Sequence, residues 1–444
     1  MKNGFLSNNA QTDTLYKNLI KSVSALFLLM AFLGCQTTQP DTRVTNYQAD
    51  IQYLKDTLPV KHPNLFFYQS EDTFHRNLDL IASKTNLSSK DDAQILMQLR
   101  EATAQLGDPH TNFGFYELLD EEGHFPIEIF WFEDGIWITG AAEKYQQAIG
   151  KQLVAINDIP METVIEKVSK VVPKNAPYFS HKRMHYFLPM YAILNYYDIT
   201  PTQTAKFTLA STDGTQEQVE ISTVVGDYNV DLFKHVTPAP YYWLSVQGDS
   251  ADLFRQHFFA EDGILLIQYN SCWSKELEER FGDAEDAKSL PSFNAFKAEV
   301  FEVLENQPVE KVIFDMRFNG GGSSPQGTQF IEELSGIEEI NQKGKLFVAI
   351  SQHTFSSAVI NAMNFRQGTN AILLGAPSGG SPNHYGEVRT LTLPNTKMEI
   401  YHSTNYFKYI EEDLEAVVPD EMVPTRFLDI AKGVDPIYEY VKGY

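Results

Sequence analysis

The segment Asp315-Met316-Arg317-Phe318-Asn319-Gly320-Gly321-Gly322 constrains the fold of this chain more than any other stretch. It follows the apolar run Lys311–Phe314, which predicts a buried strand, and it precedes a helical pattern from about Gln326 to Leu334. Consecutive glycines between a strand and a helix bring bare backbone N–H groups close to whatever binds there. Such a turn holds a phosphate, a carboxylate or the oxyanion of an acyl-transfer intermediate, and glycine alone does not choose between them.

A second strand-to-helix junction lies downstream, in Thr354-Phe355-Ser356-Ser357-Ala358-Val359. It comes after the strand-like segment Lys345–Ile350 and before the helical run Val359–Met363. A hydroxyl at such a junction sits at the positive end of the helix with amide donors nearby, where a nucleophile is useful. The alternative is an ordinary N-cap, because Ser and Thr are preferred at that position.

Together, and in this order, the two segments resemble the tricorn-core and C-terminal processing serine peptidases. The marks of that family are an Asp-Leu-Arg-x-Asn-x-Gly-Gly turn and a later Thr-x-Ser nucleophile. In this chain Met316 stands in the leucine place, and the resemblance implies that Ser356 is the nucleophile. It also implies an oxyanion hole of backbone amides around the glycine turn and directly after the nucleophile, at Gly320, Gly321 and Ser357.

The general base differs between branches of this family. The segment Leu373–Ser381 looks like the Gly-Glu-Arg-Thr-x-Gly-Lys strand and turn of the Ser-Lys branch, but Ser381 occupies the lysine position. A serine hydroxyl cannot accept a proton near neutral pH as a desolvated lysine amine can. A Ser-Lys pair is therefore excluded unless another lysine reaches the site.

The tricorn-like branch instead takes its base from an upstream histidine. The segment Leu106–Thr111 looks like the Asp-Gly-His-Thr segment of that branch, with Pro109 in place of glycine. The resemblance implies that His110 is the general base for Ser356, as in other Ser-His pairs. Without the resemblance, a histidine beside Asp-Pro is more often an ordinary turn residue.

A third group should orient the imidazole, and several residues are candidates. In the tricorn-like branch a glutamate near a C-terminal Pro-Asp segment acts indirectly, which here points to the acidic residues before Pro419, namely Glu411, Glu412, Asp413 and Glu415. The segment Asn383–Glu387 follows the lost lysine position, so His384 and Glu387, with Ser381, are further supporting candidates. A polar hairpin loop is an equally good interpretation of that segment.

The N-terminus predicts a lipoprotein. Lys17 and Lys21 precede the apolar run Val23–Gly34, which has the length of a secretory h-region rather than of a membrane span. Phe32-Leu33-Gly34-Cys35 resembles a bacterial lipobox, which implies lipidation of Cys35 in the mature protein. Resemblance to Gram-negative lipoproteins favours the outer membrane, facing either the periplasm or the exterior, and membrane contact through the lipid anchor only.

Composition and the remaining motifs argue against several other functions. The chain has 35 basic and 58 acidic residues and no Lys/Arg-rich block, which argues against nucleic-acid binding. His181 and His185 have the spacing of a metal pair, but no nearby side chains complete a ligand set, so neither a metal nor another cofactor is expected. After removal of a signal peptide only Cys272 remains, and its most probable state is a buried, inert thiol.

The predicted fold class is α/β, with a crotonase-like layered core, an N-terminal helical cap and a small PDZ-like β-rich module. Helical periodicity covers the cap, alternating strands precede a weak Gly-x-x-Leu-x-x-Ile-Asn-Gly resemblance to PDZ modules, and strands then alternate with helices. The expected divisions are residues 1–35 as signal peptide, 36–45 as tether, 46–125 as cap, 126–225 as PDZ-like module and 226–444 as peptidase core.

The leading hypothesis is a cell-envelope serine peptidase that acts on peptides or proteins. The main alternative is a non-catalytic peptide- or ligand-binding lipoprotein on the same scaffold, since folds outlive their chemistry and aromatic side chains suit a binding groove. A hydrolase of another acyl bond is a third reading. The sequence does not indicate the oligomeric state.

Overall fold

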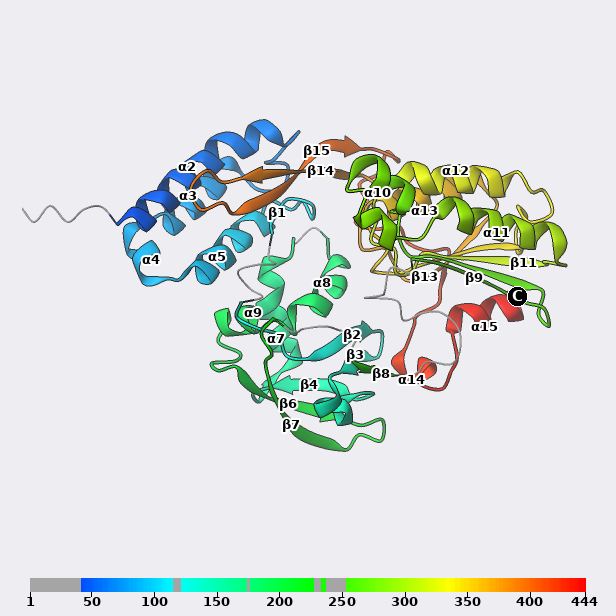
Figure 1. Ribbon diagram of the computed structural model, residues 1–444, viewed down its shortest axis with the longest axis horizontal. Coiled ribbons are helices and arrows are strands. Elements are labelled where there is room, and N and C mark those ends of the chain that lie inside the picture. The colour runs from blue at the N-terminus through cyan, green and yellow to red at the C-terminus, as the bar shows by residue number, and fades with distance from the viewer. Residues whose placement is uncertain (1–40, 115–120, 174–175, 227–232, 237–252) are drawn as a thin grey trace, which may run out of the picture.

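The computed structural model describes residues 41–114, 121–173, 176–226, 233–236 and 253–444. Figure 1 shows a helical part beside a sheet-and-helix core, with a β-rich module below them. The predicted signal peptide, Cys35 and the first part of the tether lie outside the described residues. No helix in the described part of the chain is long and apolar enough to cross a membrane.

The core is a mainly parallel sheet. Its strand order is β16-β13-β12-β11-β10-β9, and every neighbouring pair is parallel except β10 with the edge strand β9. Parallel strands need crossover connections, and helices between them provide these. The strands are β9 (Phe254–Phe259), β10 (Ile264–Tyr269), β11 (Lys311–Asp315), β12 (Leu346–Ile350), β13 (Ile372–Gly375) and β16 (Glu421–Met422).

Both faces of this sheet are covered, because successive side chains of each strand point to opposite faces. Val312 and Phe314 of β11 pack with the helices on one face, whereas Ile313 packs with the C-terminal helices on the other. The helices of the first face are α11 (Phe293–Asn306), α12 (Ser324–Ser335) and α13 (Ser357–Gly368), with α10 (Lys275–Phe281) at their edge. Those of the second are α14 (Phe427–Ile430) and α15 (Pro436–Gly443).

The N-terminal part is helical, as the periodicity predicts. Its helices are α2 (Thr42–Lys61), α3 (Glu71–Ile81), α4 (Lys84–Ser89) and α5 (Asp92–Ala104). Asp91 forms a capping box with Gln94 at the start of α5, which satisfies amides that the helix itself cannot pair. The helix α2 ends at Lys61, directly before the His62-Pro63 pair that predicts a break.

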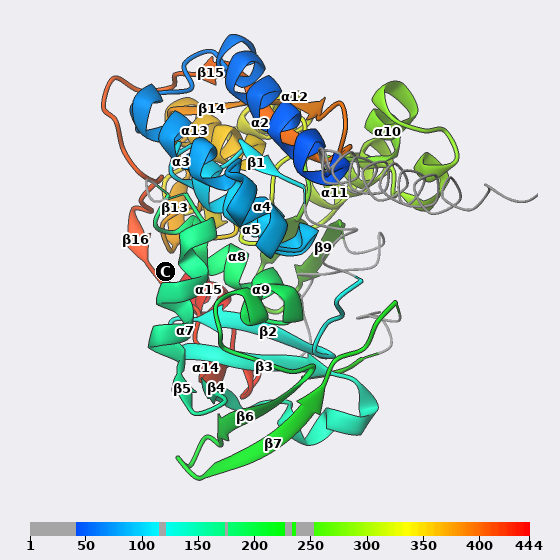
Figure 2. The same cartoon turned by 90° about the vertical axis from the view of Figure 1, so that its left-hand side faces the viewer.

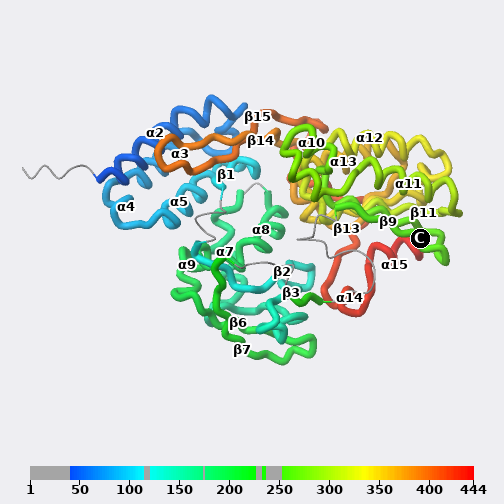
Figure 3. Tube along the Cα trace, in the orientation of Figure 1, coloured from blue at the N-terminus to red at the C-terminus, as the bar shows by residue number. Residues whose placement is uncertain are grey.

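A hairpin from the C-terminal half completes the N-terminal part. The strands β14 (His384–Thr392) and β15 (Glu399–Phe407) pair with each other, and β15 also pairs with β1 (Asn112–Phe113). Figures 2 and 3 show this hairpin lying along the N-terminal helices. The buried carboxylate of Asp50 on α2 accepts hydrogen bonds from the backbone and side chains of Asn395 and Thr396 at the hairpin tip.

The β-rich module lies between these parts in sequence. Its main sheet has the order β2-β3-β4-β6-β7, and Asn157 and Asp158 turn the chain after β4 with positive φ values of 48° and 63°. Its strands are β2 (Ile127–Phe132), β3 (Gly135–Ala141), β4 (Gln152–Ile156), β5 (Ile159–Pro160), β6 (Thr204–Ala210), β7 (Gln216–Ser222) and β8 (Lys234–His235). Its α-helices are α7 (Met161–Val168), α8 (Phe179–Phe187) and α9 (Tyr191–Tyr196).

Two of the expected divisions need correction. The tether expected over 36–45 is wrong from residue 42 onward, because α2 begins at Thr42 with Asp41 as its N-cap. The division into a cap at 46–125 and a core at 226–444 is also incomplete. Residues 384–407, which were assigned to the core, form a hairpin that pairs with β1 of the cap. Strand pairing between segments so distant along the chain leaves no local pattern in the sequence.

A buried ionic cluster connects the glycine turn to the C-terminal helix. Arg317 bonds Asp315 at 2.7 Å and Asp435 at 2.6 Å, and the three side chains are at most 5% exposed. Asp435 also caps α15 by accepting from the amide of Ile437 at 2.8 Å. The arginine therefore gives both carboxylates a cationic partner, without which their burial would be costly.

We expect Arg317→Met to lower the free energy of unfolding by about 3–5 kcal/mol, because it leaves two buried carboxylates without a cation. Urea denaturation followed by circular dichroism measures this. The matched control is Lys288→Met, which removes an exposed ion pair with Glu285 and should leave the denaturation midpoint unchanged. Equal midpoints for Arg317→Met and the parent protein would contradict the expectation.

Candidate active site

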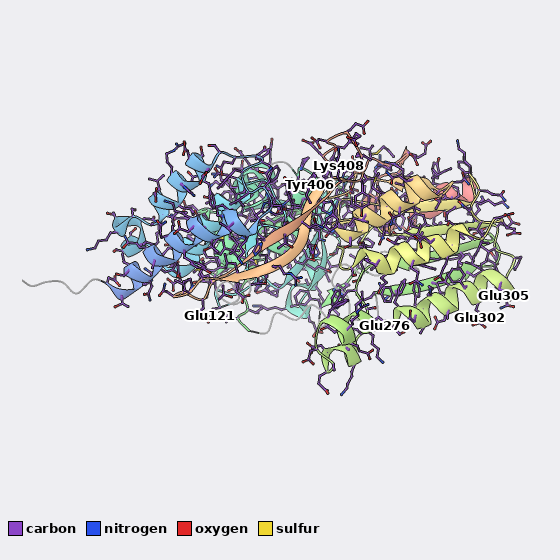
Figure 4. All side chains as sticks on the ribbon, turned by 90° about the horizontal axis from the view of Figure 1, so that it is seen from above. Glu121, Glu276, Glu302, Glu305, Tyr406 and Lys408 are labelled. Atoms are coloured by element: carbon purple, nitrogen blue, oxygen red, sulfur yellow. The ribbon has the colours of Figure 1, made fainter. Side chains whose placement is uncertain are left out.

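A cleft of about 430 Å³ lies where the N-terminal part, the module and the core meet. The segment Gly107–His110 enters it from the N-terminal part, and Phe355 and Ser356 enter it from the core. Tyr406 on the hairpin lines it as well, and Figure 4 shows this residue where the hairpin approaches the core. The further lining residues are Phe67, Ala176, Gly380, Ser381, Asn383, His384, Tyr385, Asp413, Leu414 and Glu415.

Ser356 and His110 meet in this cleft. The Nε2 atom of His110 lies 3.0 Å from the Oγ atom of Ser356, although the residues are 246 positions apart in the chain. Ser356 follows β12 and occupies the N-cap position of α13, but its side chain makes no capping hydrogen bond. The hydroxyl is directed to the imidazole, so the N-cap interpretation does not describe what this side chain does.

The backbone of Ser356 is held in an unusual conformation. Its φ of 55° and ψ of −125° lie in a region that a residue with a side chain rarely adopts. A Cβ atom on Gly321 would lie 2.7 Å from the Cβ of Ser356, so glycine is needed there for the two segments to approach. Residues kept in such strained conformations cluster at functional sites, where the surrounding structure enforces them.

Asp108 supports His110 from the opposite side of the ring. Its Oδ1 atom accepts from the His110 amide at 3.0 Å and lies 3.7 Å from the ring Nδ1 atom. Its Oδ2 atom lies 3.1 Å from His62 Nε2 and accepts from the hydroxyls of Thr111 and Ser403, each at 2.6 Å. The carboxylate thus gathers four partners around the base.

The environment of Asp108 keeps it ionised. Burial by itself would raise the pKa of this carboxyl, but the interactions with His110, His62 and Ser403 hold the pKa well below its usual range. The sequence analysis named the acidic residues near position 415 as supporting candidates and did not name Asp108. The available signal was its position two residues before His110 in the same turn.

The other supporting candidates have different places. His384 stacks on His110 at 5.9 Å between ring centroids, and its pKa is lowered to about 4 by burial and by the proximity of His110. Ser381 donates its hydroxyl to the Leu414 carbonyl on the cleft wall, where Glu415 is also found. Glu387 is exposed and is not among the residues that line the cleft, so the structure gives no contact between it and His110.

The loop that carries the acidic candidates is anchored by Asn383, the first residue of the segment that follows the lost lysine position. Its side-chain oxygen accepts from the amides of Tyr409 and Ile410 at 2.9 and 3.1 Å, and its nitrogen donates to two carbonyls of the loop. This amide places Asp413 and Glu415 along the cleft. Neither carboxylate is paired with the imidazole of His110.

The predicted oxyanion donors are not equivalent. Gly321 lies against Ser356, but the Gly321 amide donates to the Asn319 side chain at 2.9 Å. The expectation that Gly321 supplies a free donor is therefore wrong for this conformation. In the described part of the chain, the amides of Gly320 and Ser357 have no backbone acceptor, and the Ser357 hydroxyl donates to the Gly322 carbonyl at 2.7 Å.

Cys272, His181 and His185 pack within the fold rather than into the cleft. Cys272 is fully buried, as expected, and burial raises the pKa of its thiol to about 12, so it is not a nucleophile at neutral pH. His185 bonds the carbonyl of Ile129, and His181 stacks on Trp131 at 3.9 Å. No group of three His, Cys, Asp or Glu side chains in the described residues is arranged to hold a metal ion.

Comparison with known proteins shows similarity at the level of structure. No family model and no curated protein matches the sequence. The chain resembles mature CPAF complexed with lactacystin, with a TM-score of 0.61 and 13% identity over 91% of this chain and 98% of that one. Mature CPAF alone gives a TM-score of 0.60 at 13% identity, covering 90% and 96% of the two chains. A photosystem II D1 C-terminal processing protease gives 0.43 at 14% identity, covering 88% and 98%.

At this level of identity the likeness to mature CPAF concerns the fold alone. The predicted fold class, an α/β layered core with an N-terminal helical cap and a β-rich module, is confirmed. The specific PDZ-like character of the module stays a prediction, as do the roles of the individual site residues.

We expect Asp108→Asn to destabilise the fold at neutral pH by about 3 kcal/mol, because His62, Thr111 and Ser403 lose a charged acceptor. The folded-state pKa of Asp108 is depressed, so its contribution is present above the unfolded pKa of about 4 and is lost as the pH falls below that value. Urea denaturation at several pH values measures the difference between the two proteins.

That difference should be constant from pH 7 to pH 5 and should shrink below pH 4. The control is Asp79→Asn, which removes an exposed carboxylate paired with Lys55 and should show no such dependence. A difference that grows on acidification would refute the charge argument.

Proposed function

We propose that this protein is a serine peptidase that hydrolyses peptide bonds with Ser356 as nucleophile and His110 as general base. The observation that carries the proposal is the 3.0 Å contact between His110 Nε2 and Ser356 Oγ beside a glycine-rich turn. The likeness in fold to mature CPAF and the family resemblance of the motifs support it further. The proposal includes the histidine-base, tricorn-like branch, since Ser381 stands where a lysine base would be.

In the proposed reaction each residue has one step. Asp108, close to Nδ1, favours the tautomer of His110 that carries its proton there, which leaves Nε2 free to accept the Ser356 proton. The serine oxygen attacks the scissile carbonyl, and the imidazolium then gives its proton to the leaving amine. A water molecule then attacks the acyl group on Ser356 by the same proton transfers through His110 and releases it. Neither a metal nor a redox cofactor is required.

The cleft suits an extended peptide with apolar side chains. Phe67, Tyr385 and Tyr406 form an aromatic wall, with 4.7 Å between the ring centroids of each neighbouring pair. Aromatic walls bury apolar side chains well and add stacking energy for rings. We infer peptide or protein substrates, and the acidic residues Asp413 and Glu415 disfavour an acidic side chain beside them.

One observation favours the alternative of a non-catalytic binding protein. The Gly321 amide is taken by Asn319, so one expected oxyanion donor is not available in this conformation. Loss of one such donor slows acyl transfer by about 10²–10³-fold in enzymes of this kind. A binding protein would keep the aromatic cleft and tolerate this loss.

We also propose that the protein is lipid-anchored at Cys35 in the cell envelope of a Gram-negative bacterium. The support is the sequence alone, namely the apolar run that ends at a lipobox-like Phe32-Leu33-Gly34-Cys35.

A fluorophosphonate probe should label the protein at Ser356, because such probes phosphonylate only a serine activated by a base. Ser356→Ala should abolish both labelling and turnover of a peptide substrate while leaving the circular dichroism unchanged. Ser381→Ala is the matched control, since this cleft hydroxyl bonds a carbonyl and should not affect labelling. A silent parent protein that binds peptides would favour the binding function instead.

Cys35→Ser should abolish incorporation of labelled palmitate and move the protein from the membrane fraction to the soluble fraction, because acyl chains supply the membrane affinity. Cell fractionation and immunoblotting measure the distribution. Cys272→Ser serves as the control because that thiol is fully buried in the folded protein and should not be acylated. Unchanged palmitate incorporation in Cys35→Ser would exclude this anchor.

A further inference from the structure

Lys182 reaches the glycine turn from the β-rich module. A Cβ atom on Gly320 would lie 2.7 Å from its ammonium nitrogen, so a side chain at position 320 would displace the ammonium from this place. The same nitrogen lies 5.4 Å from the ring centroid of Phe355, the residue directly before Ser356. Gly320 thus touches Lys182, and the next residue, Gly321, touches the nucleophile.

Helix α8 holds the lysine in this position. Phe179 on the same helix stacks on the Phe355 ring with 4.5 Å between centroids, and the His110 ring also stacks on Phe355, with 4.7 Å between centroids. The His185 ring bonds the Ile129 carbonyl and fixes α8 against β2. The lysine, the base and the nucleophile are therefore arranged around one phenylalanine.

No carboxylate in the described part of the chain forms an ion pair with Lys182. Its ammonium lies beside Gly320 of the turn and 5.4 Å from the centroid of the Phe355 ring. A cation is normally buried with a counter-charge, and an unpaired one is costly. A negative charge that appears only during a reaction would supply the missing partner.

We propose that Lys182 is a catalytic residue of the peptidase reaction, whose ammonium group binds the oxyanion in place of the Gly321 amide. The inference rests on the proposed function. It accounts for the engaged Gly321 amide, for the lost family lysine at Ser381 and for glycine at position 320. An ammonium donor gives a charge-assisted hydrogen bond, which is about twice as strong as a neutral one.

The chemical step balances with the residues present. The Ser356 proton passes to His110 Nε2 as the serine oxygen bonds the carbonyl carbon. The π electron pair of the carbonyl moves onto its oxygen, which then faces the Lys182 ammonium and the remaining amides. When the pair returns, the carbon–nitrogen bond breaks and His110 protonates the leaving amine. Lys182 keeps its proton throughout.

The groups that face Lys182 determine the pH at which this contribution is lost. Burial, with a smaller contribution from the charge of Arg183, lowers the pKa of Lys182 to about 7. On the same helix, burial lowers the pKa values of His181 and His185 to about 4. His353, in the loop before the nucleophile, is held well below its usual pKa by burial and by its cationic neighbours. These histidines are neutral at pH 7, so Lys182 is the group of this cluster that titrates there.

The test is the pH profile of kcat/KM for a peptide substrate with the parent protein, Lys182→Met and Lys182→Arg. The parent profile should fall above about pH 7, tenfold per pH unit, as the free enzyme loses its ammonium. Lys182→Met should lower kcat by about 10²-fold with little change in KM, and its profile should lack this alkaline fall. Lys182→Arg should keep part of the rate and stay active at high pH, because guanidinium remains charged.

Gly320→Ala provides a second test that leaves the lysine in place. The new methyl group would occupy the position 2.7 Å from the ammonium and displace it, so the alkaline fall should again disappear. Lys170→Met is the matched control, since that lysine lies over Tyr197 in the module and away from the turn. Thermal denaturation of each variant checks that the fold is retained.

The inference would be overturned by an active Lys182→Met enzyme with the parent pH profile. A rise in KM at unchanged kcat for Lys182→Met would also overturn it, because the lysine would then bind a carboxylate of the substrate equally in the ground state and the transition state. Should Lys182→Met fail to fold, an unchanged profile for Gly320→Ala would overturn it. Absence of Ser356-dependent turnover in the parent protein would contradict the peptidase proposal and this inference with it.

Discussion

The buried carboxylate of Asp108 is the interaction on which the site depends. It bonds groups from three separate segments: His62 after α2, the turn that carries His110 and Thr111, and Ser403 on β15. All of these partners bond the same carboxylate. If one of them moves away, the buried charge loses a hydrogen bond, which is costly. His110 is thereby placed at the edge of the N-terminal part, facing Ser356 of the core.

The position of Ser356 depends on a complementary constraint in the backbone. The strained Ser356 is held against Gly321, and the Phe355 amide bonds the Asn319 carbonyl in the same turn. The Arg317 cluster stabilises the start of this turn, because its ion pairs join the end of β11 to the N-cap of α15. Helix α8 closes the arrangement from the module, so all three parts of the chain contribute to one cleft. This gives the module a physical route to influence the chemistry.

Much of the core could be predicted because its signals are local. The apolar run before the glycines corresponds to β11, and the helical patterns after both junctions correspond to α12 and α13. Ser356 and His110 were named from motifs, and the structure brings them together. The tether was misjudged by a few residues, because a cap and a helix start differ only subtly from a polar linker.

The sequence by itself determined which residues carry reactive groups and which segments form strands, helices and glycine turns, because those preferences act over a few neighbouring positions. Only the tertiary structure decided that Asp108 and not Glu415 lies beside the His110 ring, that Asn319 engages Gly321, and that Lys182 reaches the turn. It also decided that the hairpin at 384–407 joins the N-terminal helices. These outcomes depend on distances between segments far apart in the chain, which packing sets and a linear pattern does not record.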